Sequence, residues 1–230
     1  TGIYISNSYF GKTSRYASIA LGLAGDQPHY DVKLVNVRIE NANANGLDIV
    51  VGDHAFLENV YVSNCGQHGI YVYGSGTAYL NNCVVMDCSQ SSTATYYGFF
   101  IATRTVMVNC RAGWTGGVRL LYGARVSGSG SEFHNCKLDG NYHGLRIDAN
   151  NCKVIGGEYT TGWHGRIGIY DALNTTIIGA LIARVGTYGG VNENGTSDYT
   201  VITCCRFTGS GSDYVFVGAN STAVDNFTTG

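Results

Sequence analysis

The sequence has very little proline and few charged residues. One proline and 13% charged residues occur among 230 residues, whereas about a quarter of an average soluble domain is charged. No apolar run reaches the ~18 residues that a membrane-spanning helix needs. No stretch keeps the period of about 3.6 residues that is typical of an amphipathic helix. We therefore expect no membrane insertion and no helical bundle.

The chain also has no large excess of positive or negative charge. Fourteen basic and sixteen acidic residues give a net charge of -2, and no basic block is present, so we expect no nucleic-acid partner. No Cys/His spacing matches a zinc module and no phosphate-binding loop is found, so we expect no metal and no cofactor. The chain starts with "TGIYIS", without Met and inside a strand-like pattern. We interpret residues 1–230 as one domain that is a fragment or mature part of a longer chain.

Asparagine recurs along the chain at a nearly constant spacing. The first position of this repeat holds Asn36, Asn59, Asn82, Asn109, Asn135, Gly156, Gly179 and Cys204. The steps between them are 23, 23, 27, 26, 21, 23 and 25 residues, so the chain contains eight copies of one unit. The next position holds small residues: Val37, Val60, Cys83, Cys110, Cys136, Gly157, Ala180 and Cys205. A period of this length indicates a solenoid.

Each unit also carries a glycine followed by alternating apolar residues. The segments are "GIYIS" at 2, "GLDIV" at 46, "GIYVY" at 69, "GFFIA" at 98, "GVRLL" at 117, "GLRID" at 144 and "GIYDA" at 168. Period-2 alternation is typical of strands, and two or three strands per unit predict an all-β fold, a parallel β-helix of about eight to nine rungs. Stretches that break the period, at 7–29, 89–97, 122–131 and 186–199, are expected to be inserted loops.

The β-helix explains why asparagine and cysteine repeat. Equivalent residues of successive rungs lie about 4.8 Å apart, so corner asparagines can hydrogen-bond up and down the stack. Eight cysteines are compatible with disulfides, but in-register side chains stay near the rung spacing, whereas a disulfide needs Cβ atoms about 3.8 Å apart. We expect free, buried thiols instead.

Aromatic and charged residues gather on the outward side of the glycine-led strands. The expected outward column is Tyr4, Asp48, Tyr71, Phe100, Arg119, Arg146 and Tyr170. A water-facing sheet rarely has this composition. Two interpretations remain open. The column can form a sugar-binding groove, or it can form an interface between subunits that pack side by side.

Two kinds of polysaccharide chemistry have candidate residues here. Hydrolysis needs two carboxylates roughly 5–9.5 Å apart, and Asp148 and Asp171, with Arg146 beside them, are the candidates. Elimination needs a base and a group that stabilises the uronate charge, for which Arg119, Arg146, His143 and Tyr170 are available. The stacking candidates are Tyr71, Phe100, Trp114 and Trp163. These acids can equally be solvated surface groups paired with arginines, and the His and Trp residues can be corner packing.

The segments "LENVYVSNCGQHGIYV", "MVNCRAGWTGGVRL" and "FHNCKLDGNYHGLRI" resemble the pectin-lyase-like superfamily of single-stranded right-handed parallel β-helices. Within it, the short chain and the "GSGS" loops look most like a bacteriophage tailspike or tail fibre. The resemblance implies a homotrimer in the virion tail that binds, and often cuts, a bacterial surface polysaccharide. The alternatives are a secreted bacterial polysaccharide lyase or glycoside hydrolase, and a structural fibre module without a ligand. Only fragments of the polygalacturonase motifs occur, so no catalytic residue follows from that branch.

Overall fold

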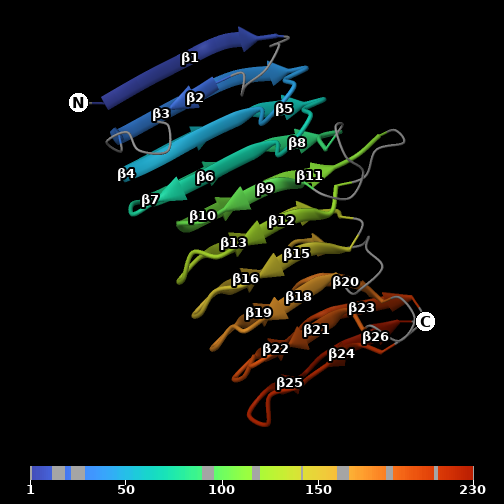
Figure 1. The fold of residues 1–230 in the computed structure, drawn as a ribbon. Helices are drawn as coiled ribbons and strands as arrows, with labels where there is room; N and C mark the ends of the chain where they lie inside the picture. The colour runs from blue at the N-terminus through green and yellow to red at the C-terminus, as the bar shows by residue number, and fades with distance from the viewer. Residues whose placement is uncertain are drawn as a thin grey trace.

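The strands of this protein stack as the rungs of a parallel β-helix. The computed structural model describes residues 2–11, 19–21, 29–89, 96–115, 120–140, 142–159, 166–184, 189–209 and 212–229. Within these ranges the chain forms 26 strands and no helix. Figure 1 shows the rungs following one another from the N-terminus at one end of the stack to the C-terminus at the other. The expected all-β solenoid is confirmed.

Each rung contributes to three parallel sheets. Three long strands pass through two sheets each: β1 (Gly2–Phe10), β3 (His29–Glu40) and β4 (Leu47–Glu58). The first sheet contains the start of β4 and β2 (Ile19–Leu21), β6 (Ile70–Gly74), β9 (Tyr97–Ile101), β12 (Tyr122–Val126), β15 (His143–Ile147), β18 (Ile167–Tyr170), β21 (Val191–Asn194) and β24 (Tyr214–Val215).

The other two sheets follow in the same order along each rung. The second sheet contains parts of β1, β3 and β4, then β7 (Thr77–Asn81), β10 (Arg104–Val108), β13 (Glu132–His134), β16 (Lys153–Ile155), β19 (Thr176–Ile178), β22 (Val201–Thr203) and β25 (Thr222–Val224). The third contains the ends of β1 and β3, then β5 (Tyr61–Ser63), β8 (Val84–Met86), β11 (Arg111–Gly113), β14 (Lys137–Leu138), β17 (Glu158–Tyr159), β20 (Leu181–Arg184), β23 (Arg206–Gly209) and β26 (Phe227–Thr229).

The asparagine repeat marks the corner between the second and third sheets. Its members all have φ between 48° and 64°, in the left-handed region: Asn7, Asn36, Asn59, Asn82, Asn109, Asn135, Gly156, Gly179, Cys204 and Asp225. Asparagine and glycine enter this region most readily. The amides also hydrogen-bond along the stack, from Asn59 to Asn36 at 3.0 Å and from Asn36 to Asn7 at 3.1 Å. The predicted ladder is therefore confirmed for these rungs.

The core is a column of side chains that point inward from all three sheets. Leu34, Leu57, Leu80, Met107 and Phe133 lie on consecutive rungs of the second sheet and are each at most 1% exposed. All eight cysteines are free, and seven of them are buried. The expectation of stacked free thiols is confirmed. Burial raises the pKa of Cys152 to about 11, so this thiol remains protonated and unreactive at neutral pH.

The glycine-led motif predicted the wrong register in three rungs. The sheet position expected for the strand that begins at Gly117 is filled by β12. Arg125 of β12 pairs with Phe100 on one side and with Arg146 on the other. Residues 122–126 therefore form a strand, not the expected loop, and the expected loops at 7–29 and 186–199 likewise contain strands, β2 and β21 (Val191–Asn194). Tyr4 lies opposite Lys33 in the second sheet. Gly168 pairs with Arg146, which shifts Tyr170 by two residues relative to the expected column.

Candidate functional site

The outward face of the first sheet carries a continuous column of functional side chains. Asp48, Tyr71, Phe100, Arg125 and Arg146 occupy the same register position on five consecutive rungs. The rings of Tyr71 and Phe100 are parallel, with centroids 4.8 Å apart and an interplanar angle of 7°. The column thus has an acid at one end, a flat aromatic centre and two guanidinium groups at the other end.

A second aromatic column lies beside it, at the start of the strands. His68, Tyr97, Tyr122 and His143 stack in this order, with ring centroids 4.8, 5.1 and 5.5 Å apart. A glycine follows each ring residue because the core leaves no room there. A Cβ at Gly69 would lie 2.1 Å from Cγ1 of Val85. The glycine-led motif is therefore a packing requirement of the corner.

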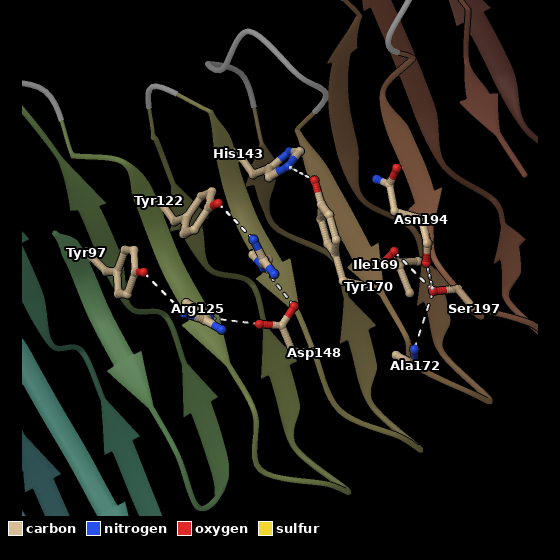
Figure 2. Close-up of polar contacts among 11 residues, drawn as sticks. Tyr97, Tyr122, Arg125, His143, Asp148, Ile169, Tyr170, Ala172, Asn194 and Ser197 are labelled. Atoms are coloured by element: carbon tan, nitrogen blue, oxygen red, sulfur yellow. Dashed lines mark hydrogen bonds and ion pairs between the residues drawn. The ribbon is translucent and has the colours of Figure 1, made fainter. Parts of the chain in front are cut away.

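Asp148 links the two arginines. Its Oδ2 accepts a hydrogen bond from Nε of Arg125 and its Oδ1 accepts one from Nε of Arg146, both at 2.7 Å. The arginines also donate to the hydroxyls of Tyr97, at 3.2 Å, and Tyr122, at 2.9 Å. Figure 2 shows the side chains of Tyr97, Tyr122, Arg125 and Asp148 on one side of the sheet. Two positive charges share one carboxylate, so the cluster keeps an excess positive charge.

Tyr170 and His143 continue this cluster onto the next rung. The Tyr170 hydroxyl and Nε2 of His143 share a hydrogen bond of 2.9 Å (Figure 2). The guanidinium carbon of Arg146 lies 4.0 Å from the centroid of the Tyr170 ring, a cation–π contact. Burial raises the pKa of Tyr170 above its ordinary value, so the side chain is a phenol at neutral pH. In this form it is a hydrogen-bond donor and an acid rather than a base.

Two further groups on this face of the first sheet, His68 and Asp48, have shifted pKa values. Burial, together with the charge of Arg125, lowers the pKa of His68 to about 4. Its Nδ1 accepts a hydrogen bond from the backbone N–H of Tyr97 at 3.0 Å. Burial also raises the pKa of Asp48, whose buried Oδ1 has no hydrogen-bond partner among the described residues. The other oxygen, Oδ2, accepts a hydrogen bond from Nδ2 of Asn45 at 3.2 Å.

The structure brings together most of the site residues expected from the sequence. Arg146, Asp148, His143, Tyr170, Tyr71 and Phe100 all lie on the first sheet. Asp171 is at the corner that follows, where its Oδ1 accepts hydrogen bonds from the backbone N–H and the hydroxyl of Thr196, at 2.8 and 3.1 Å. Trp114 follows β11 of the third sheet, outside this cluster. Arg119 and Trp163 lie outside the described residues.

Four residues of the site were not among the sequence candidates: Arg125, Tyr97, Tyr122 and His68. Arg125 takes the column position that was expected for Arg119. The signal that could have found Tyr97, Tyr122 and His68 is their common place directly before a glycine, which His143 shares. Within the described ranges, no group of three or more His, Cys, Asp or Glu side chains could hold a metal ion, and no helix is long and apolar enough to cross a membrane.

Comparison with known proteins supports the fold. A family model described as "Right handed beta helix region" matches residues 20–120. Among solved structures, the A-module of mannuronan C-5 epimerase AlgE6 from Azotobacter vinelandii is similar, with a TM-score of 0.68 and 16% sequence identity. The match covers 89% of this chain and 66% of that one. A search of curated proteins found no significant match. The fold is thus a right-handed parallel β-helix, in agreement with the resemblance to the pectin-lyase-like proteins.

Proposed function

We propose that the outward face of the first sheet binds an acidic polysaccharide. The observation that carries this proposal is the in-register column in which stacked Tyr71 and Phe100 lead to Arg125 and Arg146. Flat rings suit the apolar faces of sugar rings, and paired guanidinium groups suit carboxylates or other acidic substituents. The similarity to a module of an epimerase named for a polysaccharide supports the same class of ligand.

The rung geometry also suits a polymer. Successive rungs repeat about every 4.8 Å, so the five-residue column from Asp48 to Arg146 extends over roughly 19 Å, four rung spacings. Several consecutive sugar units can therefore lie along it. Asp48, with its raised pKa, would bond to hydroxyls at the end away from the arginines.

The biological setting that we propose is a tailspike-like protein of a bacteriophage, active as a homotrimer in the virion tail on a host surface polysaccharide. The resemblance of the repeat motifs to phage β-helices supports it. Light scattering separates it from a secreted, monomeric bacterial enzyme, because a trimer is expected only for the phage protein. A fibre module without a ligand is the third possibility, and it would bind no polysaccharide.

A catalytic role is favoured by one further contact, the hydrogen bond between Tyr170 and His143 beside Arg146. In an elimination, a base removes the proton at C5, the C4–O bond breaks, a C4–C5 double bond forms and the leaving oxygen is protonated. Arg146 would stabilise the uronate charge. Tyr170, after passing its phenol proton to Nε2 of His143, would take the C5 proton, give it to the leaving oxygen and recover its own proton from His143. Hydrolysis by Asp148 and Asp171 remains the alternative, although both carboxylates already accept hydrogen bonds.

The test is incubation with capsular, O-antigen and uronate polysaccharides, following reducing ends and unsaturated-uronate absorbance together. Reducing ends alone indicate hydrolysis, and both signals indicate elimination. Binding is measured on the same panel. Arg146→Gln is expected to weaken binding of the anionic polymer about tenfold or more, since hydrogen bonds to charged groups contribute roughly 1.5–3 kcal/mol. Arg111→Gln, at an exposed position of the third sheet, is the matched control and should leave binding unchanged.

Asp148→Asn separates binding from catalysis. If Asp148 only balances the two arginines, the variant is less stable but binds the anionic polymer at least as well, because the cluster gains net positive charge. Loss of turnover with unchanged stability would instead identify Asp148 as a catalytic acid. Absence of binding and of both product signals from the whole panel would contradict the proposed function.

A further inference from the structure

The second sheet, a different face of the molecule, carries another column of exposed side chains, most of them aromatic. Tyr4, Lys33, Phe56 and Tyr79 occupy one register position on consecutive rungs of β1, β3, β4 and β7. The rings of Phe56 and Tyr79 are parallel, with centroids 5.1 Å apart and an interplanar angle of 8°. Phe56 is 43% exposed and Tyr79 is 39% exposed. Together they form a flat apolar surface in contact with water.

This surface borders a cavity of about 350 Å³ lined by Lys33, Phe56, Leu57, Glu58, Tyr79 and Asn81. That volume lies at the lower end of the range for small-molecule sites. The polar groups around the rings are complementary in kind: an ammonium donor, a carboxylate acceptor and an amide that can do both. The ring of His54 stacks beside these two rings, with its centroid 6.0 Å from that of Phe56 and 6.4 Å from that of Tyr79.

We propose that this cavity is a second saccharide site, specific for an uncharged pyranose. The ring hydrogens of a pyranose carry partial positive charge and fit the negative faces of Phe56 and Tyr79. Its hydroxyls both donate and accept, which matches Lys33, Glu58 and Asn81. The lining charges of Lys33 and Glu58 cancel. An acidic sugar therefore gains little here, in contrast to the arginine cluster of the first sheet.

A second copy of the chain is a less suitable occupant. The rungs that follow Tyr79 on the same sheet carry Arg104, Glu132 and Lys153, and the outward column beside Phe56 carries Glu58. The cores of protein interfaces are depleted of charged residues, and two rings provide only a small apolar area. A small ligand can cover the rings of Phe56 and Tyr79 while these charged side chains stay in contact with water.

The site is tested by saturation-transfer NMR of the full chain with the methyl glycosides of glucose, galactose, mannose and N-acetylglucosamine at millimolar concentration. Saturation of the ring protons of at least one glycoside is expected. The transfer should persist in Tyr79→Phe, which keeps the flat ring, and should be lost in Tyr79→Leu, which keeps an apolar side chain but no aromatic face. Phe227→Ala, which removes an exposed ring from β26 of the third sheet, is the control and should retain the signal.

This proposal rests on the second sheet, so it can be wrong while the proposed polysaccharide binding by the first sheet is right, and two variants separate these outcomes. Arg146→Gln should not change transfer to the neutral glycosides, and Tyr79→Leu should not change binding of an acidic polysaccharide by the first sheet. Absence of saturation transfer from the folded protein to any of the four glycosides would overturn the proposal. It would also be overturned if Tyr79→Leu retained the transfer, or if that variant changed the association state of the protein, since the face would then be an interface between copies.

Discussion

At the scale of the residue, His68 is held in the neutral form by its surroundings. It lies in the aromatic column of the first sheet, near Arg125, and its Nδ1 is already an acceptor for the backbone N–H of Tyr97. Protonation would place a second positive charge beside Arg125 and remove this hydrogen bond. The folded protein therefore opposes the charge that the unfolded chain accepts readily.

This shift predicts a loss of stability in mild acid. The pKa of His68 is about 4 in the folded protein against an ordinary value of 6.5. Between these values the unfolded chain binds the additional proton, so the free energy of unfolding falls as the pH is lowered from 6.5 to 4. The contribution of His68 is at most about 3 kcal/mol. Urea unfolding at several pH values measures it.

The variant His68→Asn should remove this part of the pH dependence, because Oδ1 of asparagine can still accept the hydrogen bond from Tyr97 but does not titrate in this range. His54→Asn is the matched control, since the His54 side chain is 51% exposed. An identical acid response in His68→Asn and the parent chain would show that His68 is not the group responsible.

At the scale of the element, the corners follow directly from the sequence and the sheet register does not. A corner needs positive φ, which few residues adopt readily, so the Asn36-type repeat located the corners correctly. The glycine-led strands need only an inward position without a side chain. Glycine occurs 33 times in the chain, so this signal is ambiguous: it misplaced Tyr4 and Tyr170 and missed Arg125. The aromatic centre at Tyr71 and Phe100 was predicted correctly because each ring lies two residues after a glycine, Gly69 and Gly98, that occupies the corner position.

Cys204 is the corner residue least suited to its backbone conformation. It has φ of 52° and is exposed, whereas most equivalents are Asn or Gly. Cys204→Asn is therefore expected to raise the free energy of unfolding by about 0.5–1 kcal/mol, a part of the roughly 1–2 kcal/mol cost of a left-handed residue. Urea unfolding under reducing conditions measures the change.

The adjacent Cys205 provides a control with the opposite expected effect on stability, because it is fully buried in the core. Cys205→Asn should lower the free energy of unfolding, since it buries an amide among apolar side chains. Stabilisation by both substitutions, or by neither, would contradict the assignment of the corner conformation to position 204 alone.

At the scale of the whole molecule, the last rung is attached by the parallel pairing of β24, β25 and β26 with the rung before it and by one buried carboxylate. Glu193 is 1% exposed. Its Oε2 accepts hydrogen bonds from the backbone N–H groups of Val217 and Gly218, at 3.0 and 3.1 Å, and its Oε1 accepts one from the Ser221 hydroxyl at 2.7 Å. Because rungs contact only their neighbours, this end can open without disturbing the middle of the solenoid.

Glu193→Gln should therefore release residues 212–229 selectively. The amide replaces one acceptor by a donor, and unsatisfied buried groups cost about 1–3 kcal/mol, so hydrogen exchange in this segment should become about tenfold faster or more. Peptides from β9 to β15 should keep their protection. Glu132→Gln, a half-buried acid in the middle of the stack that pairs with His134 and Lys153, is the control. Uniform loss of protection along the chain would contradict a locally attached last rung.

The repeated corner also has a consequence for how such a gene can change. Each turn carries its own left-handed corner and its own core layer, and the corner residues are 21 to 29 positions apart. An in-frame duplication or deletion of one such unit moves every later turn by one step along the axis, about 4.8 Å, and leaves both ends intact. The length of the outward columns of side chains can therefore grow or shrink by whole turns during evolution, without any change to the turns that remain.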